Sequence, residues 1–145
     1  MKFQIKRIWL VLLFLLLLCL LSFIIWFNSP KKLLDIDKTE VVSIHIFDGT
    51  QGKGTEITST DDITHIIDNL SSIEIKPRKP SLGYMGYRFR VEVFTKTSNS
   101  SSATETFIIN SETDVRIDPF FYDVVSGEID FQFLQQLLSD RKSVV

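Results

Sequence analysis

The stretch IWLVLLFLLLLCLLSFIIWF, residues 8–27, differs from the rest of the chain in the solvent that it suits, lipid instead of water. It carries no charge, and sixteen of its twenty residues are Leu, Ile, Val or Phe. Twenty helical residues span about 30 Å, which matches the hydrocarbon core of a bilayer. Insertion of these side chains into lipid is worth at most about 5–10 kcal/mol. We therefore expect residues 8–27 to form a transmembrane helix that binds the lipid bilayer.

The charges that flank this stretch predict its orientation. Lys2, Lys6 and Arg7 precede it, whereas only two lysines, at positions 31–32, follow it closely. Positively charged flanks are retained on the cytoplasmic side of a membrane. We therefore expect a single-pass protein of the cell membrane, with residues 1–7 cytoplasmic and the C-terminal domain extracytoplasmic.

A cleaved signal peptide and a lipoprotein signal are the alternatives to a retained anchor. The apolar region of a signal peptide runs about 7–15 residues and ends in small residues. This run is longer, and its exit at Trp26 and Phe27 is bulky. A lipoprotein would use Cys19, but Leu18 is larger than the residue usual before a lipid-bearing cysteine. Trp9 and Trp26 also suit the two headgroup layers, so these features favour a retained helix.

The rest of the chain has the length of one domain and an acidic charge. About 118 residues remain after the apolar stretch, enough to bury a core. Three of the 16 basic residues and none of the 18 acidic residues precede residue 30, so the remainder carries a net charge of about −5. Nucleic-acid binding relies on neutralising phosphates, so we expect no nucleic-acid partner. A domain without cysteine fits a Gram-positive envelope better than a eukaryotic secretory pathway.

Hydrophobic periodicity predicts the secondary structure of this domain. Alternation that begins at Val42 and Ile44 predicts a first strand with both side chains on its apolar face. The spacing i, i+3, i+4, i+7 over residues 63–70 predicts an amphipathic helix, capped by Thr60 or by Asp61. A later strand has one apolar face, formed by Tyr87, Phe89, Val91 and Val93.

The expected element order is β-β-α-β-β-β-β-β-α, with loops mainly of hairpin length. This order predicts an antiparallel sheet with one or two helices packed on it, an α+β fold. The domain is expected to span residues 41–139, after a tether at 28–40 and before a frayed tail at 140–145. Some apolar residues of the tether are expected to pack onto the domain: Leu33, Leu34 and Ile36.

The search for catalytic or metal-binding residues gives a negative result. The two histidines, His45 and His65, have no ligand partners at the spacings of a zinc site. Asp61 and Asp62 are adjacent on the predicted helix and do not face each other, so helix capping explains both. We expect no catalytic residue, no metal, no cofactor and no enzymatic activity.

One segment is a candidate binding surface for an anionic partner. Residues 76–90 hold five cations within an acidic domain. The candidate contact residues are Arg78, Lys79, Tyr84, Tyr87, Arg88 and Arg90. Such a surface suits phospholipid headgroups, an anionic polymer or an acidic protein segment. The simpler interpretation is a solvated strand face, in which Arg88 and Arg90 pair with Glu92 or Glu74 across strands.

Three pieces of the domain carry a resemblance: residues 42–46 (VSIHI), residues 57–73 and residues 86–93 (GYRFRVEV). Together they resemble small uncharacterised envelope proteins of Gram-positive bacteria, which join an N-terminal anchor or lipid attachment to a compact α+β ectodomain. The likeness covers about residues 41–138 and lies in core pattern and turns. It implies a fold and a compartment, and it transfers no activity and no site residue.

Two functions are therefore expected ahead of catalysis. The first is a membrane-tethered extracytoplasmic interaction or accessory domain, with another envelope protein as partner through a sheet edge or the basic loop. The alternative is a sensor ectodomain that binds a ligand or an anionic polymer in a pocket lined by aromatic residues, among them Tyr84, Tyr87, Phe120 and Tyr122. An enzyme is the least expected, because no set of titratable residues converges.

Overall fold

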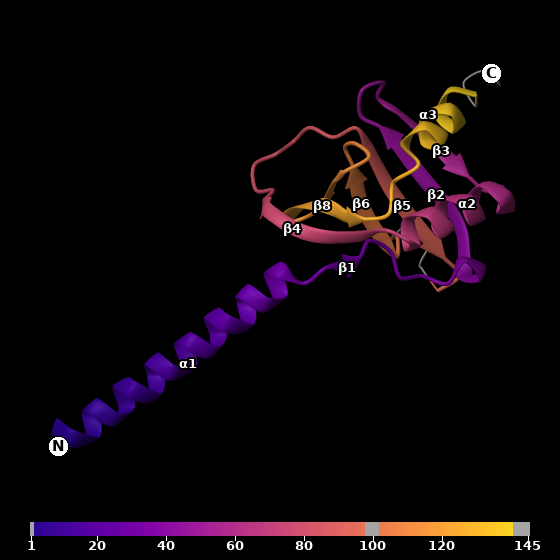
Figure 1. Ribbon diagram of the computed structural model, residues 1–145. Coiled ribbons are helices and arrows are strands. Elements are labelled where there is room, and N and C mark those ends of the chain that lie inside the picture. Colours follow the sequence, from indigo (N-terminus) through magenta and orange to yellow (C-terminus); the bar gives the residue numbers. More distant parts are fainter. Residues whose placement is uncertain (1, 98–101, 141–145) are drawn as a thin grey trace.

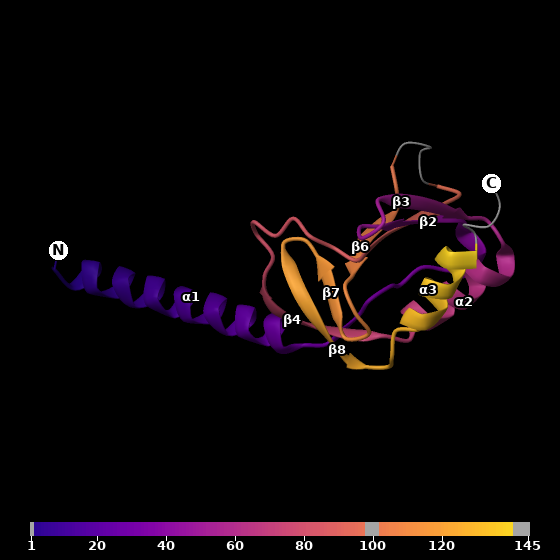
Figure 2. The same cartoon turned by 90° about the horizontal axis from the view of Figure 1, so that it is seen from above.

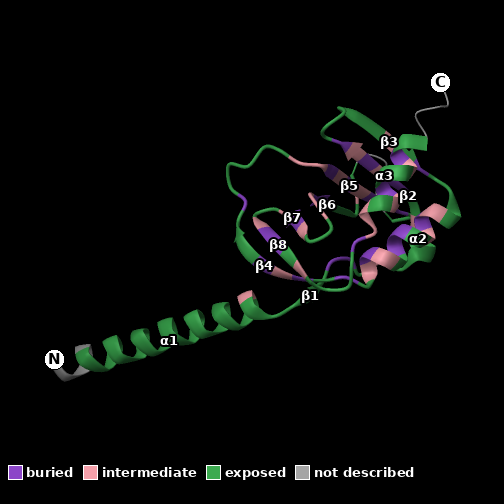
Figure 3. Cartoon of the chain, turned by 45° about the horizontal axis from the view of Figure 1, so that its top comes forward, coloured by how far each residue is buried: buried purple, intermediate pink, exposed green. Residues whose placement is uncertain are grey.

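A computed structural model describes residues 2–97 and 102–140, with side chains from residue 6 onward. Its N-terminal helix α1, Lys2–Asn28, extends away from a folded domain (Figure 1). The portion Lys6–Asn28 is long and apolar enough to cross a membrane, and none of it is buried by the rest of the protein (Figure 3). An apolar surface of this extent is suited to lipid rather than to water.

Eight strands form one open antiparallel sheet in the order β1-β4-β8-β7-β6-β5-β2-β3. The strands are β1 Lys31–Lys32, β2 Val41–Asp48, β3 Lys53–Ile57, β4 Glu74–Pro80, β5 Phe89–Thr95, β6 Glu105–Ile109, β7 Asp114–Ile117 and β8 Phe120–Ser126. The other helices are a 3-10 turn η1, Lys38–Glu40, with α2, Thr60–Ser71, and α3, Phe131–Asp140. The sheet is strongly curved, and α2 and α3 lie together at the end of the domain away from α1 (Figure 2). The α+β class predicted from the sequence is confirmed.

The core lies between one face of the sheet and the two helices. On β5 the buried residues Phe89, Val91 and Val93 alternate with half-buried ones, as a period of two requires. The α2 residues in the predicted spacing are all buried: Ile63, Ile66, Ile67 and Leu70. α3 adds Leu134 and Leu138 to the same cluster. Alternation and helical spacing therefore identify most of the core correctly.

The N-terminus of α2 differs from the prediction by one residue. Ser59, in extended conformation, accepts a hydrogen bond from the backbone amide of Asp62 at 3.5 Å and caps the helix. Thr60 is already the first helical residue, so the predicted cap at Thr60 or Asp61 was wrong. All three residue types are good caps, so sequence alone did not distinguish them.

A bulge in β2 reverses the direction of Val42. The pairing of β2 with β5 shifts between Val41 and Ser43, which inserts one extra residue into β2. Ile44 is fully buried as predicted, but Val42 is exposed and Val41 contacts the core instead. The prediction that Val42 shares the apolar face was therefore wrong, because a bulge breaks the period of two.

The segment expected to be a tether is largely part of the domain. Only Ser29 and Pro30 separate α1 from β1, whose two lysines pair with β4. Leu33 and Leu34 are buried in the core and Ile36 packs against it, as expected, and the amide of Leu33 donates to the carbonyl of Ile73 at 2.9 Å. The expected element order omitted β1 because two lysines carry no strand signal of their own.

The described part of the chain begins at Lys2 and ends at Asp140. α1 begins at Lys2, ahead of the expected apolar span, because helical structure continues through the charged flank. Asp140 is the last residue of α3. The remainder of the expected frayed tail, residues 141–145, lies outside the described residues.

Candidate functional site

The strand register carries one row of side chains across the sheet on the face away from the core. In order from β4 to β2, the paired positions are Lys79, Phe121, Arg116, Ile108, Arg90 and Phe47. Their neighbours in the chain are buried in the core, among them Phe89, Ile109 and Tyr122. Because side chains alternate along a strand, the row occupies the opposite face, which we call the outer face. The row begins on β4, crosses β8, β7 and β6, and reaches β5 and then β2.

Phe121 is the centre of a first group on the outer face. Its ring meets that of Tyr84 edge-on, with 4.9 Å between the centroids. Lys79 Nζ lies 5.1 Å from the Phe121 centroid and 3.3 Å from the hydroxyl of Tyr84. The guanidinium of Arg78 lies 5.9 Å from the Phe121 ring. Three candidates, Arg78, Lys79 and Tyr84, are therefore close together, around a phenylalanine that the sequence did not single out.

Phe47 is the centre of a second group on the same face. The centroid of the Tyr87 ring lies 6.1 Å from that of Phe47, and the guanidinium of Arg90 lies 5.5 Å from the Phe47 centroid. Tyr87 was expected beside Phe89 on the core face, and that expectation was wrong. β5 begins only at Phe89, so the residues before it are not held in the strand ladder and do not follow its alternation.

Arg88 binds the turn between β2 and β3 rather than projecting from β5. Its Nη1 donates to Thr50 Oγ1 at 2.7 Å, and its carbonyl accepts from the amide of Gly49 at 2.8 Å. The guanidinium also lies 5.1 Å from the centroid of Phe89. The expected pairing of Arg88 with Glu92 or Glu74 is replaced by contacts to a hydroxyl and a ring.

Carboxylates of the sheet neutralise part of the candidate surface. Arg78 forms ion pairs with Asp114 and, at 3.0 Å, with Asp123. Arg90 Nε lies 3.2 Å from Glu92, along one strand rather than across strands. The partners of Arg78 come from β7 and β8, which are remote in the sequence. Internal pairing lowers the charge that the outer face can offer to an anion.

Arg116 is a structural cation that the sequence analysis missed. Its side chain is only 6% exposed, and its Nη1 donates to the carbonyls of Tyr84 at 3.1 Å and Gly86 at 3.2 Å. Arg116 therefore fastens the loop between β4 and β5 onto the outer face. Its position between Val115 and Ile117 was the available signal for a buried role.

The four aromatic residues expected to line a ligand pocket lie in different surroundings. Tyr122 is buried in the core and accepts a hydrogen bond from Lys31 Nζ at 3.1 Å. Phe120 lies edge-on to Trp26 of α1, with 6.0 Å between centroids. Tyr84 and Tyr87 belong to the two separate groups described above. These contacts do not bring the four rings together around one site.

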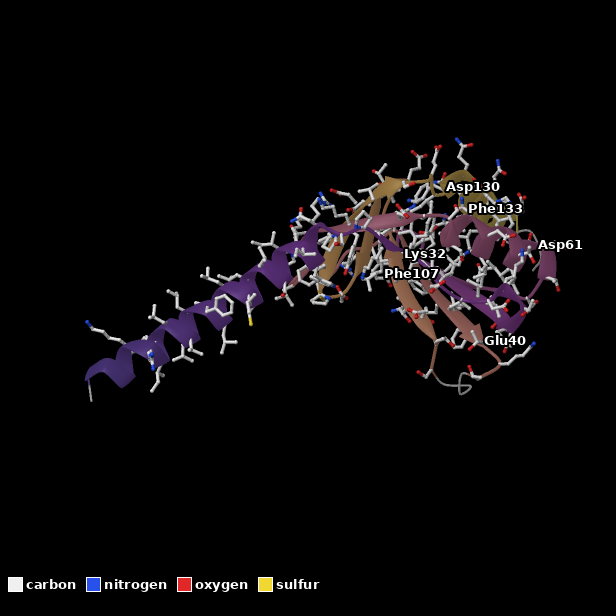
Figure 4. The ribbon with its side chains drawn as sticks, turned by 60° about the horizontal axis from the view of Figure 1, so that its bottom comes forward. Lys32, Glu40, Asp61, Phe107, Asp130 and Phe133 are labelled. Carbon is white, nitrogen blue, oxygen red and sulfur yellow. The ribbon has the colours of Figure 1, made fainter. Side chains whose placement is uncertain are left out.

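A shallow groove of about 520 Å³ lies along α2 and the start of α3. It is lined by Asp61, Thr64, His65, Asp68, Asn69 and Asp130. Two of these, Asp61 and Asp130, lie at the end of the domain away from α1 (Figure 4). His65 Nε2 lies 2.9 Å from Asp130 Oδ2, and this contact, with the amide of Phe133, holds the pKa of Asp130 below its usual value. Within residues 2–97 and 102–140, no three acidic, His or Cys side chains are placed to hold a metal ion.

Asp48 ends β2 and organises the turn that receives Arg88. Its carboxylate accepts hydrogen bonds from the amide and hydroxyl of Thr50, at 2.9 and 2.7 Å, and from the amide of Gln51 at 3.3 Å. Burial alone would raise the pKa of Asp48, but these hydrogen bonds and the charge of Arg88 outweigh it. The pKa of Asp48 therefore lies below its ordinary value of 3.8.

We expect Asp48→Asn to lower the free energy of unfolding by about 1 kcal/mol at neutral pH, because hydrogen bonds to a charged acceptor are the stronger ones. A pKa that is depressed in the folded state stabilises the fold above the ordinary value of 3.8, and this stabilisation disappears as the pH falls through the lower folded value. The difference between wild type and variant should therefore shrink on acidification, measured by urea unfolding at several pH values. Thr50→Val should reproduce part of the effect. A difference that is the same at all pH values would contradict it.

Comparison with known proteins adds no relative. No protein-family model matches the chain, and no match was found among curated proteins or solved structures.

Proposed function

We propose that this chain is a single-pass membrane protein whose extracytoplasmic domain is an interaction or accessory domain held at the membrane surface. Its partner is another protein of the cell envelope. The proposal includes the orientation expected from Lys2, Lys6 and Arg7, and the Gram-positive compartment implied by the resemblance. The domain acts by binding rather than by catalysis.

The connection between α1 and the sheet carries this proposal. Trp26 and Phe27, at the end of the apolar helix, meet the ring of Phe120 at 6.0 and 6.3 Å between centroids. Ser29 and Pro30 are the only residues between α1 and β1. With α1 in a bilayer, the domain is held directly at the lipid surface. A domain in that position meets the partners that are themselves held at the membrane.

Binding of an anionic polymer is the second candidate function. The observation in its favour is that Lys79, Arg116 and Arg90 stand in one cross-strand row, with the Phe121 ring between the first two and Ile108 between the last two. Against it, Arg90 is paired with Glu92 and the side chain of Arg116 is almost fully buried. The row is therefore better suited to stabilising the outer face than to gripping a polymer.

A membrane-impermeant amine cross-linker on intact Gram-positive cells that produce the full chain tests both functions and the orientation. Exposed lysines such as Lys38 and Lys53 provide the reactive groups. We expect adducts in intact cells and repeated capture of the same envelope protein, identified by mass spectrometry. Adducts to polymer alone would favour the second candidate.

Two results would contradict the proposal. Reaction only after permeabilisation would reverse the orientation, because the domain lysines would then be cytoplasmic. The second test uses Leu13→Arg with Leu17→Arg, which should weaken insertion by about 5–7 kcal/mol on the biological scale. If this variant stays in the membrane fraction as fully as Leu13→Ala with Leu17→Ala, α1 is not the element that holds the protein there.

A further inference from the structure

The loop between β4 and β5 ends in an apolar tip that no other described residue covers. Leu82 is 80% exposed and Met85 is 89% exposed. Both exceed every large apolar residue described in α1, where the most exposed, Trp9, reaches 69%. The two side chains lie three residues apart in one loop, and together they offer apolar surface to a partner.

The base of this loop is firmly held. Ser81 is buried, its amide donates to the carbonyl of Pro119 at 2.8 Å, and its hydroxyl bonds Asp118. Arg116 donates to two loop carbonyls, and the ring of Tyr84 packs on the outer face. The loop thus presents its tip from a fixed base, which reduces the entropy lost on binding.

The loop starts next to the end of α1. Pro80, the last residue of β4, pairs with Phe120, and Phe120 contacts both Trp26 and Phe27 of the helix. In Figures 1 and 2 the loop is the part of the domain that reaches back toward α1. Tryptophan at the end of a membrane helix lies at the headgroup level. The tip that follows Pro80 therefore lies near the same level.

Cations accompany the apolar tip. Lys79 lies two residues before Ser81 and hydrogen-bonds a hydroxyl rather than a carboxylate. Arg88, at the other end of the loop, donates to the hydroxyl of Thr50, and its charge also acts on Asp48. A basic side chain close to an anionic membrane surface contributes about 1 kcal/mol of attraction. Apolar side chains that enter the interface between flanking cations are the pattern of a peripheral membrane contact.

We propose that residues 81–88 form a second membrane contact, in which Leu82 and Met85 enter the outer lipid interface while Lys79 and Arg88 meet anionic headgroups. This contact fixes the tilt of the domain on the bilayer. It rests on the proposed function in one respect, that α1 spans the membrane.

The test uses the full chain in nanodiscs of phosphatidylcholine with phosphatidylglycerol, carrying an environment-sensitive fluorophore at one cysteine. Native Cys19 reports whether α1 is in lipid. Met85→Cys and Leu82→Cys, each with Cys19→Ala, report the loop. Gln135→Cys with Cys19→Ala, exposed on α3 at the far end of the domain, is the matched control. We expect blue-shifted emission and protection from iodide at positions 19, 82 and 85, and neither at position 135.

The outcomes separate the two proposals. Protection at Cys19 with full iodide access at Met85 overturns the loop contact and leaves the membrane helix intact. Iodide access at Cys19 overturns the membrane helix itself. Lys79→Gln should shift the contact equilibrium at Met85 about fivefold toward water, which is 1 kcal/mol expressed as a ratio. An unchanged signal in this variant and in purely zwitterionic discs would overturn the role of the headgroups.

Discussion

Replacing Ile44 by alanine should lower the free energy of unfolding of the domain by about 2–5 kcal/mol. Ile44 is fully buried at the centre of the core, and truncation there leaves a cavity. Val42→Ala, two residues earlier on the same strand, should cost less than about 0.5 kcal/mol. The bulge between Val41 and Ser43 turns the Val42 side chain away from the core.

The measurement is urea unfolding of the full chain in detergent micelles, followed by circular dichroism. Tryptophan fluorescence is less direct, because Trp9 and Trp26 both lie in α1 and Trp26 meets the domain at its edge, through Phe120. Similar losses in the Ile44 and Val42 variants would show that β2 alternates without a bulge. Hydrogen exchange of the β2 amides would locate the irregular pair independently.

Leu34→Ala should also destabilise the domain by about 2–5 kcal/mol. A flexible tether would tolerate this change, but Leu34 is only 2% exposed and belongs to the core cluster. The neighbouring Asp35→Ala is the control and should change stability by less than about 0.5 kcal/mol, because its carboxylate is exposed.

The same unfolding measurement checks this second prediction. If the Leu34 and Asp35 changes had equally small effects, residues 31–36 would be a flexible tether and not part of the fold. Leu33→Ala offers an independent repeat, since Leu33 is buried in the same cluster. If only Leu33 and Leu34 respond, the link between membrane helix and domain is as short as the structure shows.

Local patterns predicted the helices and most strands because their information is local. The spacing of Ile63, Ile66 and Leu70 reads directly as one face of α2, and all three are buried. The alternation of Phe89 and Val91 works in the same way for β5. Both patterns depend on residues that are close in the sequence, so they could be recognised without knowledge of the tertiary structure.

Features set by long-range pairing were not predictable from the sequence. The bulge at Val42 and the strand at Lys31 arise from register with β5 and β4, which no local period encodes. The burial of Arg116 depends on the loop that crosses above it. In each case the partner lies far away in the chain.

The arrangement of the candidate surface was not evident from the sequence. Because Arg78 and Arg90 are close in the sequence, we expected them in one patch. The strand register places Lys79 and Arg90 in the same row of the outer face. The patch nevertheless divides into groups around Phe121 and Phe47. Asp114 and Asp123 pair with Arg78 from β7 and β8, and no local pattern indicated that β8 would lie beside β4.

The two-residue connection at Ser29 and Pro30 also determines how the domain would find its partner. A long stalk would let the domain reach partners at a range of distances from the membrane. With α1 in a bilayer, this short link keeps the domain in a thin layer at the surface, where it diffuses in two dimensions. Encounter then depends on the number of partners per unit area of membrane. Confinement of both molecules raises their effective concentration, so a contact that is weak in solution suffices for assembly at the surface.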